Sequence, residues 1–153
     1  MEWFLKTYDE LTVDEFHDIL KLRIDIFVVE QNCPYPELDT KDKKAWHFYG
    51  KNNDKIIAYT RIFKPGDYYQ EAAFGRVVVH QEYRNQKLGY KLVEKTLEQI
   101  NNLFGNVSVK IGAQQHLEKF YGSFGFQQVG EPYIEDGIPH IYMKKKQLNL
   151  IFI

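Results

Sequence analysis

The chain has 153 residues, 44% of them apolar and 27% charged, which suits one domain over residues 1–153 that buries its core without disulfides. Lysine and arginine (20) nearly balance aspartate and glutamate (21), so the net charge of −1 argues against nucleic acid as the main partner. The sequence has one cysteine, no signal-peptide pattern and no apolar run of membrane length, which favours a cytoplasmic protein without a membrane partner.

The first third of the chain predicts a strand followed by a helix. Residues 3–8 suit a short strand, and Thr12 and Glu15 have the spacing of a capping box at a helix start. Apolar residues then recur every three or four positions, and the prolines of the next segment forbid continuation, so we expect the helix to end near Glu30. Residues 31–44 form a polar connection that is too long for a tight turn, which favours a functional loop.

The rest of the chain alternates between strand and helix patterns. Three short runs of β type predict an antiparallel meander: WHFYG, KIIAYTRIF and AAFGRVVVH. After Glu82 the apolar spacing becomes helical through Ile100, NVSVKIGA predicts a strand and HLEKFYGSF a helix, and two closing strands follow. The order β-α-β-β-β-α-β-α-β-β predicts an α/β fold with a mixed, mostly antiparallel sheet of six or seven strands and helices on both faces.

The stretch EYRNQKLGYKL joins a predicted strand to a predicted helix and is rich in hydrogen-bond donors. The start of a helix has free amide groups and a positive dipole end, so residues 84–89 could cradle a phosphate or a pyrophosphate. The alternative is a solvated loop capped by Asn85, in which Gly89 eases the packing of the helix. Taken alone, the stretch favours the solvated loop somewhat.

Four segments resemble the GCN-five-related N-acetyltransferase (GNAT) family. VVVHQEYRNQKLGYKL resembles its pyrophosphate-binding motif, R/Q-x-x-G-x-G/A after a strand: Arg84 matches the first position and Gly89 the last, whereas Lys87 replaces the first glycine. KFYGSFGF resembles the later helix and turn of the family. LRIDIFVVEQNCPYPELD and IEDGIPH resemble its ElaA-type subfamily, so the resemblance covers nearly the whole chain. It implies the GNAT fold, in which two parallel strands, here residues 73–79 and 107–112, separate to admit the pantetheine arm of acetyl-CoA.

The same resemblance implies acetyl-CoA as the cosubstrate. Its pyrophosphate would lie on the backbone amides of residues 86–90 with Arg84 nearby, and its pantetheine would pair with the strand that ends at Val79. Val78 would donate its amide to the tetrahedral oxyanion, and Gln114 takes the place of a family asparagine that contacts the cofactor. The expected cofactor-binding residues are Val77, Val78, Val79, Arg84, Asn85, Gln86, Lys87, Leu88, Gly89, Tyr90, Gln114 and Tyr121.

Three residues are the candidates for catalysis. Tyr121 matches the family tyrosine assigned as the acid that protonates the leaving thiolate, although an arbitrary tyrosine here would be a half-exposed partner of the core. An acceptor ammonium must also lose a proton, and Glu30 and His140 are the candidate bases, with His116 ranked below both. Glu30 equally suits a solvated helix end, and a lone histidine such as His140 more often has a structural role.

Two further residues carry open alternatives. Arg23 lies close to the apolar stripe of the first helix and either binds a substrate carboxylate or pairs with Glu30 or Asp25, of which pairing is slightly favoured. Cys33 has no base among its sequence neighbours, so direct transfer in a ternary complex is preferred to an acyl-enzyme. The scattered histidines and the one cysteine lack the spacing of zinc ligands, and no metal is expected.

The sequence thus predicts an N-acetyltransferase that acts on a primary amine of a small molecule or a protein. The competing hypothesis is a non-catalytic acyl-CoA-binding sensor, for which the lysine at position 87 leaves room. The acidic and aromatic character of residues 35–42, with Glu135 and Asp136, would suit a cationic amine. The family resemblance and an apolar tail, residues 148–153, together suggest a homodimer.

Overall fold

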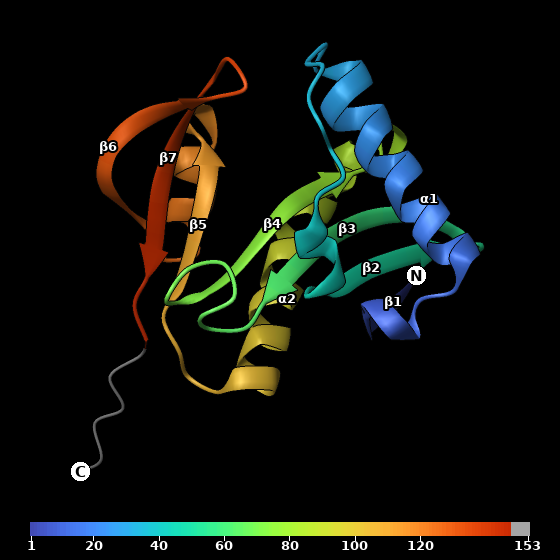
Figure 1. The fold of residues 1–153 in the computed structure, drawn as a ribbon, viewed down its shortest axis with the longest axis horizontal. Coiled ribbons are helices and arrows are strands. Elements are labelled where there is room, and N and C mark those ends of the chain that lie inside the picture. The colour runs from blue at the N-terminus through green and yellow to red at the C-terminus, as the bar shows by residue number, and fades with distance from the viewer. Residues whose placement is uncertain (148–153) are drawn as a thin grey trace.

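The computed structural model describes residues 1–147, which form one sheet of seven strands in the order β1-β2-β3-β4-β5-β7-β6 (Figure 1). The strands are β1 (Glu2–Thr7), β2 (Trp46–Asn52), β3 (Lys55–Phe63), β4 (Ala72–Val79), β5 (Val109–Gln114), β6 (Gln127–Glu135) and β7 (Ile138–Lys145). The helices are α1 (Val13–Ile24), α2 (Leu88–Phe104) and α3 (Glu118–Gly122). Neighbouring strands are antiparallel, except that β4 and β5 are parallel. The predicted order of elements and the mixed sheet are confirmed.

The helices α1 and α2 cover opposite faces of the sheet, with α1 in front of it and α2 behind it in Figure 1. Successive side chains of a strand point to opposite faces, and the adjacent residues Phe48 and Tyr49 of β2 do so here. Phe48 belongs to the apolar cluster that contains Leu92 of α2, whereas Tyr49 belongs to the cluster that contains Ile19 of α1. The sheet is therefore the middle layer between two cores, as predicted.

The start and the end of the first helix agree with the sequence prediction. The Thr12 hydroxyl accepts a hydrogen bond from the Glu15 amide (3.1 Å), and the Glu15 carboxylate accepts one from the Thr12 amide (2.9 Å), which completes the capping box. After Ile24 the helix widens into a π-helical segment, Asp25–Glu30, before it ends. Segments of this kind are rare and often occur at functional sites.

The parallel strands β4 and β5 separate along their length. Among residues 1–147 they share two pairs of facing residues, Ala72 with Val109 and Ala73 with Lys110, and both strands continue beyond these pairs. The separation of two parallel strands implied by the family resemblance is therefore present. The second strand begins at Val109 rather than at 107, because the Val107 amide donates to Gly105 in the turn after α2.

A bulge bends β4 where the two strands part. The register of β4 against β3 shifts between Tyr59 and Arg61 of β3. Opposite this shift Arg76 has a φ of 53°, in the left-handed region that residues with a side chain rarely adopt. Beyond the bulge β4 stays paired with β3, through Val78 with Tyr59 and Val79 with Ala58, whereas within residues 1–147 it no longer pairs with β5.

None of the helices within residues 1–147 is long and apolar enough to cross a membrane. The apolar tail that is one of the two grounds for the homodimer expectation, residues 148–153, lies outside the described residues. The dimer therefore stays a prediction.

Candidate active site

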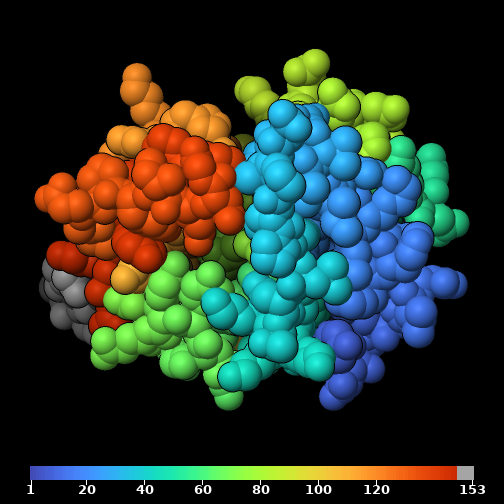
Figure 2. Space-filling view, turned by 45° about the horizontal axis from the view of Figure 1, so that its top comes forward, coloured from blue at the N-terminus to red at the C-terminus, as the bar shows by residue number. Residues whose placement is uncertain are grey.

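The separation of β4 and β5 opens a groove of about 860 Å³. Figure 2 shows the molecular surface hollowed between the loop of residues 31–44, in cyan, and the β6–β7 hairpin, in orange and red. Of the expected site residues, the groove brings together Glu30, Val77, Val78, Val79, Arg84, Gln114, Tyr121 and His140. His116 also lines it. Both candidate bases and the candidate acid thus face one space, although they come from three distant parts of the chain.

A second hollow lies at the start of α2. It is lined by Arg84, Lys87, Gly89, Tyr90 and Phe120, so Arg84 borders both spaces. Three expected residues of this region line neither hollow. Asn85 and Gln86 are exposed in a 3₁₀ turn, and the Leu88 side chain is buried in the core. Leu88 can therefore contribute its backbone amide to a cofactor site but not its side chain.

Lys87 has a left-handed backbone conformation of the kind that favours glycine. Helix α2 begins at Leu88 rather than soon after Glu82, because residues 81–86 form a 3₁₀ turn and Lys87 follows with φ 55° and ψ 25°. Glycine adopts this left-handed conformation freely, whereas a residue with a side chain is destabilised by roughly 1–2 kcal/mol. The amides of Gly89 and the residues beside it lie at the start of the helix, where backbone amides have no partner within the helix.

Arg84 contacts two elements that line the groove, the segment after α1 and the end of β4. Its Nη2 lies 2.7 Å from Glu30 Oε2 at the end of the π-helical segment. Its Nε donates to the backbone carbonyl of Val79, the last residue of β4 (3.2 Å). Glu30 is thus neither a free solvated carboxylate nor the partner of Arg23. Its partner is Arg84, the residue that was expected near the pyrophosphate.

Tyr121 is almost fully buried, with 5% of its surface exposed. Its ring packs against Phe74 and Phe126, and burial raises the pKa of its hydroxyl. Within residues 1–147 the hydroxyl has no hydrogen-bond partner, although the residue lines the groove. Tyr121 therefore keeps its proton at neutral pH and has a donor to offer to a ligand.

The ring orientation of His140 is fixed by its neighbours. Nδ1 lies 2.7 Å from the carbonyl oxygen of Ile138, and because a carbonyl can only accept, Nδ1 carries the proton. Nε2 lies 3.6 Å from Glu135 Oε2, and the ring packs beside Tyr133 with its centroid 5.6 Å away. The neutral imidazole thus has its lone pair on Nε2, which suits a proton acceptor.

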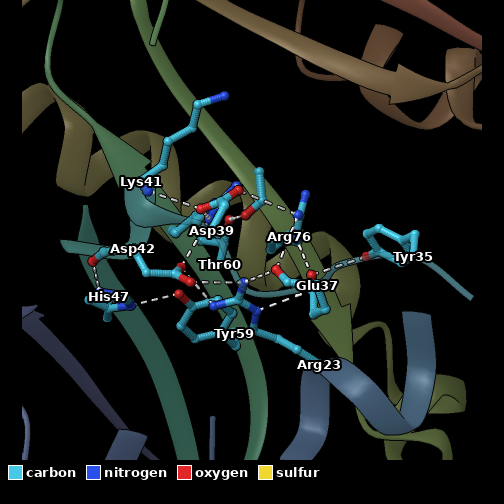
Figure 3. A network of polar contacts seen from close by, with 12 residues as sticks. Arg23, Tyr35, Glu37, Asp39, Lys41, Asp42, His47, Tyr59, Thr60 and Arg76 are labelled. Carbon is cyan, nitrogen blue, oxygen red and sulfur yellow. Dashed lines mark hydrogen bonds and ion pairs between the residues drawn. The ribbon is translucent and has the colours of Figure 1, made fainter. Parts of the chain in front are cut away.

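Arg23 pairs within the protein, but not with the predicted partners. It is fully buried and lies 2.8 Å from Asp42 and 3.4 Å from Glu37, both in the loop that follows the helix (Figure 3). Asp25 instead pairs with Lys21 at 2.8 Å. The prediction of Glu30 or Asp25 was wrong because Arg23 faces the sheet, over which the loop folds back, and not the exposed side of the helix.

Two more arginines, which the sequence analysis missed, complete this network. Arg61 of β3 donates to Asp39 (2.7 and 3.0 Å) and to Asp42 (2.9 Å). Arg76 of the β4 bulge donates to Glu37 at 2.6 Å. The sequence could have indicated them, since each arginine stands inside an apolar strand pattern. A charge buried in this way requires a partner of opposite sign.

A neutral histidine also ties the loop to the sheet. His47 of β2 lies 2.9 Å from the backbone carbonyl of Asp42 through Nε2 and 2.7 Å from the Tyr59 hydroxyl through Nδ1. Burial lowers the pKa of His47. The loop of residues 31–44 is thus fixed over the sheet by ion pairs and by an uncharged hydrogen bond.

Two contacts join this loop to the far wall of the groove. The Cys33 thiol donates to the backbone carbonyl of Asp136 in the β6–β7 turn (3.3 Å). The side chains of Gln31 and Gln114 meet at 3.4 Å. Within residues 1–147, no three histidine, cysteine, aspartate or glutamate side chains are grouped to hold a metal ion.

Comparison with known proteins decides the family. Residues 5–147 match the family model of the acetyltransferase (GNAT) domain. The chain belongs to the GNAT family. It is 43% identical to protein ElaA of Escherichia coli (strain K12) over 151 residues, which cover 97% of this chain and 99% of ElaA. This GNAT protein is therefore of the ElaA type, as the sequence predicted.

Solved structures confirm the GNAT fold. The crystal structure of Escherichia coli ElaA has a TM-score of 0.88 over 95% of this chain and 99% of ElaA. An acyl-CoA N-acyltransferase from Pseudomonas aeruginosa has a TM-score of 0.90 and 37% identity over 95% of this chain and 99% of its own. An aminoglycoside 6′-N-acetyltransferase complexed with coenzyme A shares the fold at a TM-score of 0.69 and 12% identity, over 97% of this chain and 99% of its own.

Proposed function

We propose that this GNAT protein is a cytoplasmic, single-domain N-acetyltransferase that moves an acetyl group from acetyl-CoA to a primary amine. The observation that carries the proposal is the groove between the separated β4 and β5, which extends from Arg84 at the start of α2 past Tyr121 to His140. A GNAT acyltransferase needs such a space to hold a thioester and an acceptor side by side.

The donor half of the proposed site consists of backbone and arginine. The pyrophosphate of acetyl-CoA would rest on the amides at the start of α2, where the helix dipole favours an anion, with Arg84 beside it. The pantetheine arm would hydrogen-bond to the backbone of Val77 and Val79 as an added strand. Gln114, at the end of β5, would contact it from the opposite wall.

The proposed reaction is a direct transfer in a ternary complex. The neutral amine attacks the thioester carbonyl carbon, the new C–N bond forms, and a backbone amide of β4 that faces the groove donates to the oxyanion. The expected donor, the Val78 amide, points to β3 instead, because Val78 pairs with Tyr59 and the His80 amide two residues further on donates to Ile57. The C–S bond then breaks, and the sulfur takes a proton from Tyr121 and leaves as coenzyme A. The amine gives its proton to Glu30 or His140, which lie on opposite walls of the groove.

The acceptor half has an aromatic and polar lining. Tyr133 and Tyr142 stack with their ring centroids 4.4 Å apart, and Glu135 and Asp136 add carboxylates to the same space. Rings and carboxylates of this kind favour a cationic amine. We therefore propose that the acceptor is a small molecule or a protein side chain that carries an ammonium group.

Calorimetric titration with acetyl-CoA and with coenzyme A, followed by thiol release against a panel of amines, tests the proposal. The expected result is binding of both ligands and thiol release that depends on the amine. Binding without release by any amine would favour the acyl-CoA sensor. Failure to bind either ligand would overturn the proposed cofactor site.

A further inference from the structure

Arg84 binds two groups that also have a role in the proposed reaction, a backbone carbonyl of β4 and a candidate base. Its Nε donates to the Val79 carbonyl, which belongs to the backbone that the pantetheine would pair with. Its Nη2 holds Glu30, one of the two proposed bases, at 2.7 Å. A cofactor bound in the groove would compete for both contacts of this one side chain.

We propose that Arg84 is a positioning residue that couples the binding of acetyl-CoA to the release of the Glu30 carboxylate. The inference rests on the proposed function. A pyrophosphate carries more negative charge than one carboxylate, so the guanidinium shifts toward the phosphates when they bind at the start of α2. An amide N–H of the pantetheine then takes the place of Arg84 Nε at the Val79 carbonyl.

The release of Glu30 changes its chemistry. Among the described residues, Arg84 is the one cation within ion-pair distance of Glu30. A carboxylate at the end of a helical segment, beside the negative end of the dipole and without a cation, is a better proton acceptor than one held by a guanidinium. Glu30 would therefore accept the proton of the amine once the thioester is in place, and the donor would bind before the proton is removed.

The proposed coupling between cofactor binding and Glu30 makes a prediction that would not follow if Glu30 acted only as a base. Glu30 competes with the cofactor for Arg84, so removal of its charge should strengthen binding while it slows turnover. The two side chains are 30% and 39% exposed, and a partly exposed ion pair of this kind corresponds to about a two- to fivefold change in affinity.

The test measures the dissociation constant of coenzyme A by calorimetry for the wild type, Glu30→Gln, Arg84→Gln and the double variant. We expect Glu30→Gln to bind about two- to fivefold more tightly than the wild type. In the Arg84→Gln background the same change should leave the affinity unaltered, since the competition requires the arginine. Glu82→Gln is the matched control, because Glu82 is an exposed carboxylate of the same turn, 4.0 Å from Lys55.

The outcomes separate the coupling from the proposed function. An unchanged or weaker affinity of Glu30→Gln, or a gain equal to that of Glu82→Gln, would overturn the coupling, with the acetyltransferase proposal intact. A gain that persists in the Arg84→Gln background would also overturn it. A wild-type protein that does not bind coenzyme A would overturn both. Thermal unfolding of each variant establishes that it is folded.

Discussion

The carboxylate of Glu37 and the guanidinium of Arg76 lie 2.6 Å apart, and this ion pair joins the loop of residues 31–44 to the bulge of β4. Glu37 is buried, and Arg76 reaches it from the left-handed conformation that the bulge imposes. Glu37 also accepts from Arg23 and from the Tyr35 hydroxyl. One side chain of the loop therefore holds the helix, the bulged strand and the rim of the groove in a fixed relation.

Replacement of Glu37 by alanine should lower the free energy of unfolding by about 3 kcal/mol, because it removes one partner of a buried network of charges. Arg23 would keep Asp42, but Arg76 would lose its shortest ion pair. Denaturant unfolding measures the change. Glu131→Ala, at an exposed position of β6, is the control, and a loss no greater than that of the control would contradict the prediction.

The left-handed Lys87 gives a prediction on the turn before α2. Lys87→Gly should unfold with a free energy about 1 kcal/mol higher than Lys87→Ala, because glycine adopts this conformation without the steric penalty of a side chain. If backbone amides hold the pyrophosphate, both variants should retain most of the affinity for coenzyme A. A loss of affinity shared by both variants would show instead that the lysine side chain contacts the phosphates.

Tyr121→Phe should lower kcat by at least about 100-fold and leave the dissociation constant of coenzyme A nearly unchanged, because the hydroxyl acts on the leaving sulfur. Thiol release and calorimetry measure the two quantities. Tyr83→Phe removes a hydroxyl that lies 3.4 Å from the Asn52 side chain, and it serves as the control. A Tyr121→Phe variant with wild-type turnover would exclude this residue as the acid.

The stability of the fold in acid should depend on Glu15. Burial by itself would raise the pKa of Glu15, but hydrogen bonds from Lys6, Tyr49 and Thr12 outweigh it and lower the pKa from its ordinary 4.5 to about 2. The unfolded chain therefore binds this proton first as the pH falls, and the stabilisation, complete above about pH 4.5, is lost toward pH 2.

Glu15→Gln tests this dependence. We expect the variant to be less stable than the wild type at pH 7 by about 1–3 kcal/mol, as for a half-buried hydrogen-bonded group that loses its charge. The difference should shrink as the pH falls below about 4.5. Urea unfolding at several pH values gives the two curves, and curves that stay parallel down to pH 2 would contradict the assignment.

The sequence predicted what depends on local pattern and missed what depends on long-range pairing. The capping box at Thr12 needs residues only three positions apart, so the sequence was sufficient for it. The partners of Arg23 lie 14 and 19 positions further along the chain, and Arg76 finds Glu37 across 39 positions. Such pairs depend on how a loop folds back over the sheet, which local periodicity does not encode.

In the candidate site, too, the features set by local sequence were predicted and those set by long-range pairing were missed. The turn before α2 followed from the order of strand, donor-rich stretch and helix, and the structure brings Tyr121 to the same groove. The partner of Glu30 did not follow, because Arg84 lies 54 positions away, beyond the reach of helical spacing. The left-handed conformation of Arg76 was also missed, since a bulge appears in the register between strands and not within one strand.

The two facing pairs between β4 and β5 have a consequence for hydrogen exchange. Beyond those pairs the edges of both strands face the groove, and no other strand of residues 1–147 pairs with their amides on that side. A ligand that occupies the gap and binds only the folded chain would add protection along both edges at once, and at 100 times its dissociation constant it would stabilise the fold by about 2.7 kcal/mol. The slowing of exchange in the second halves of β4 and β5 would then report the occupancy of the groove, even before the acceptor is known.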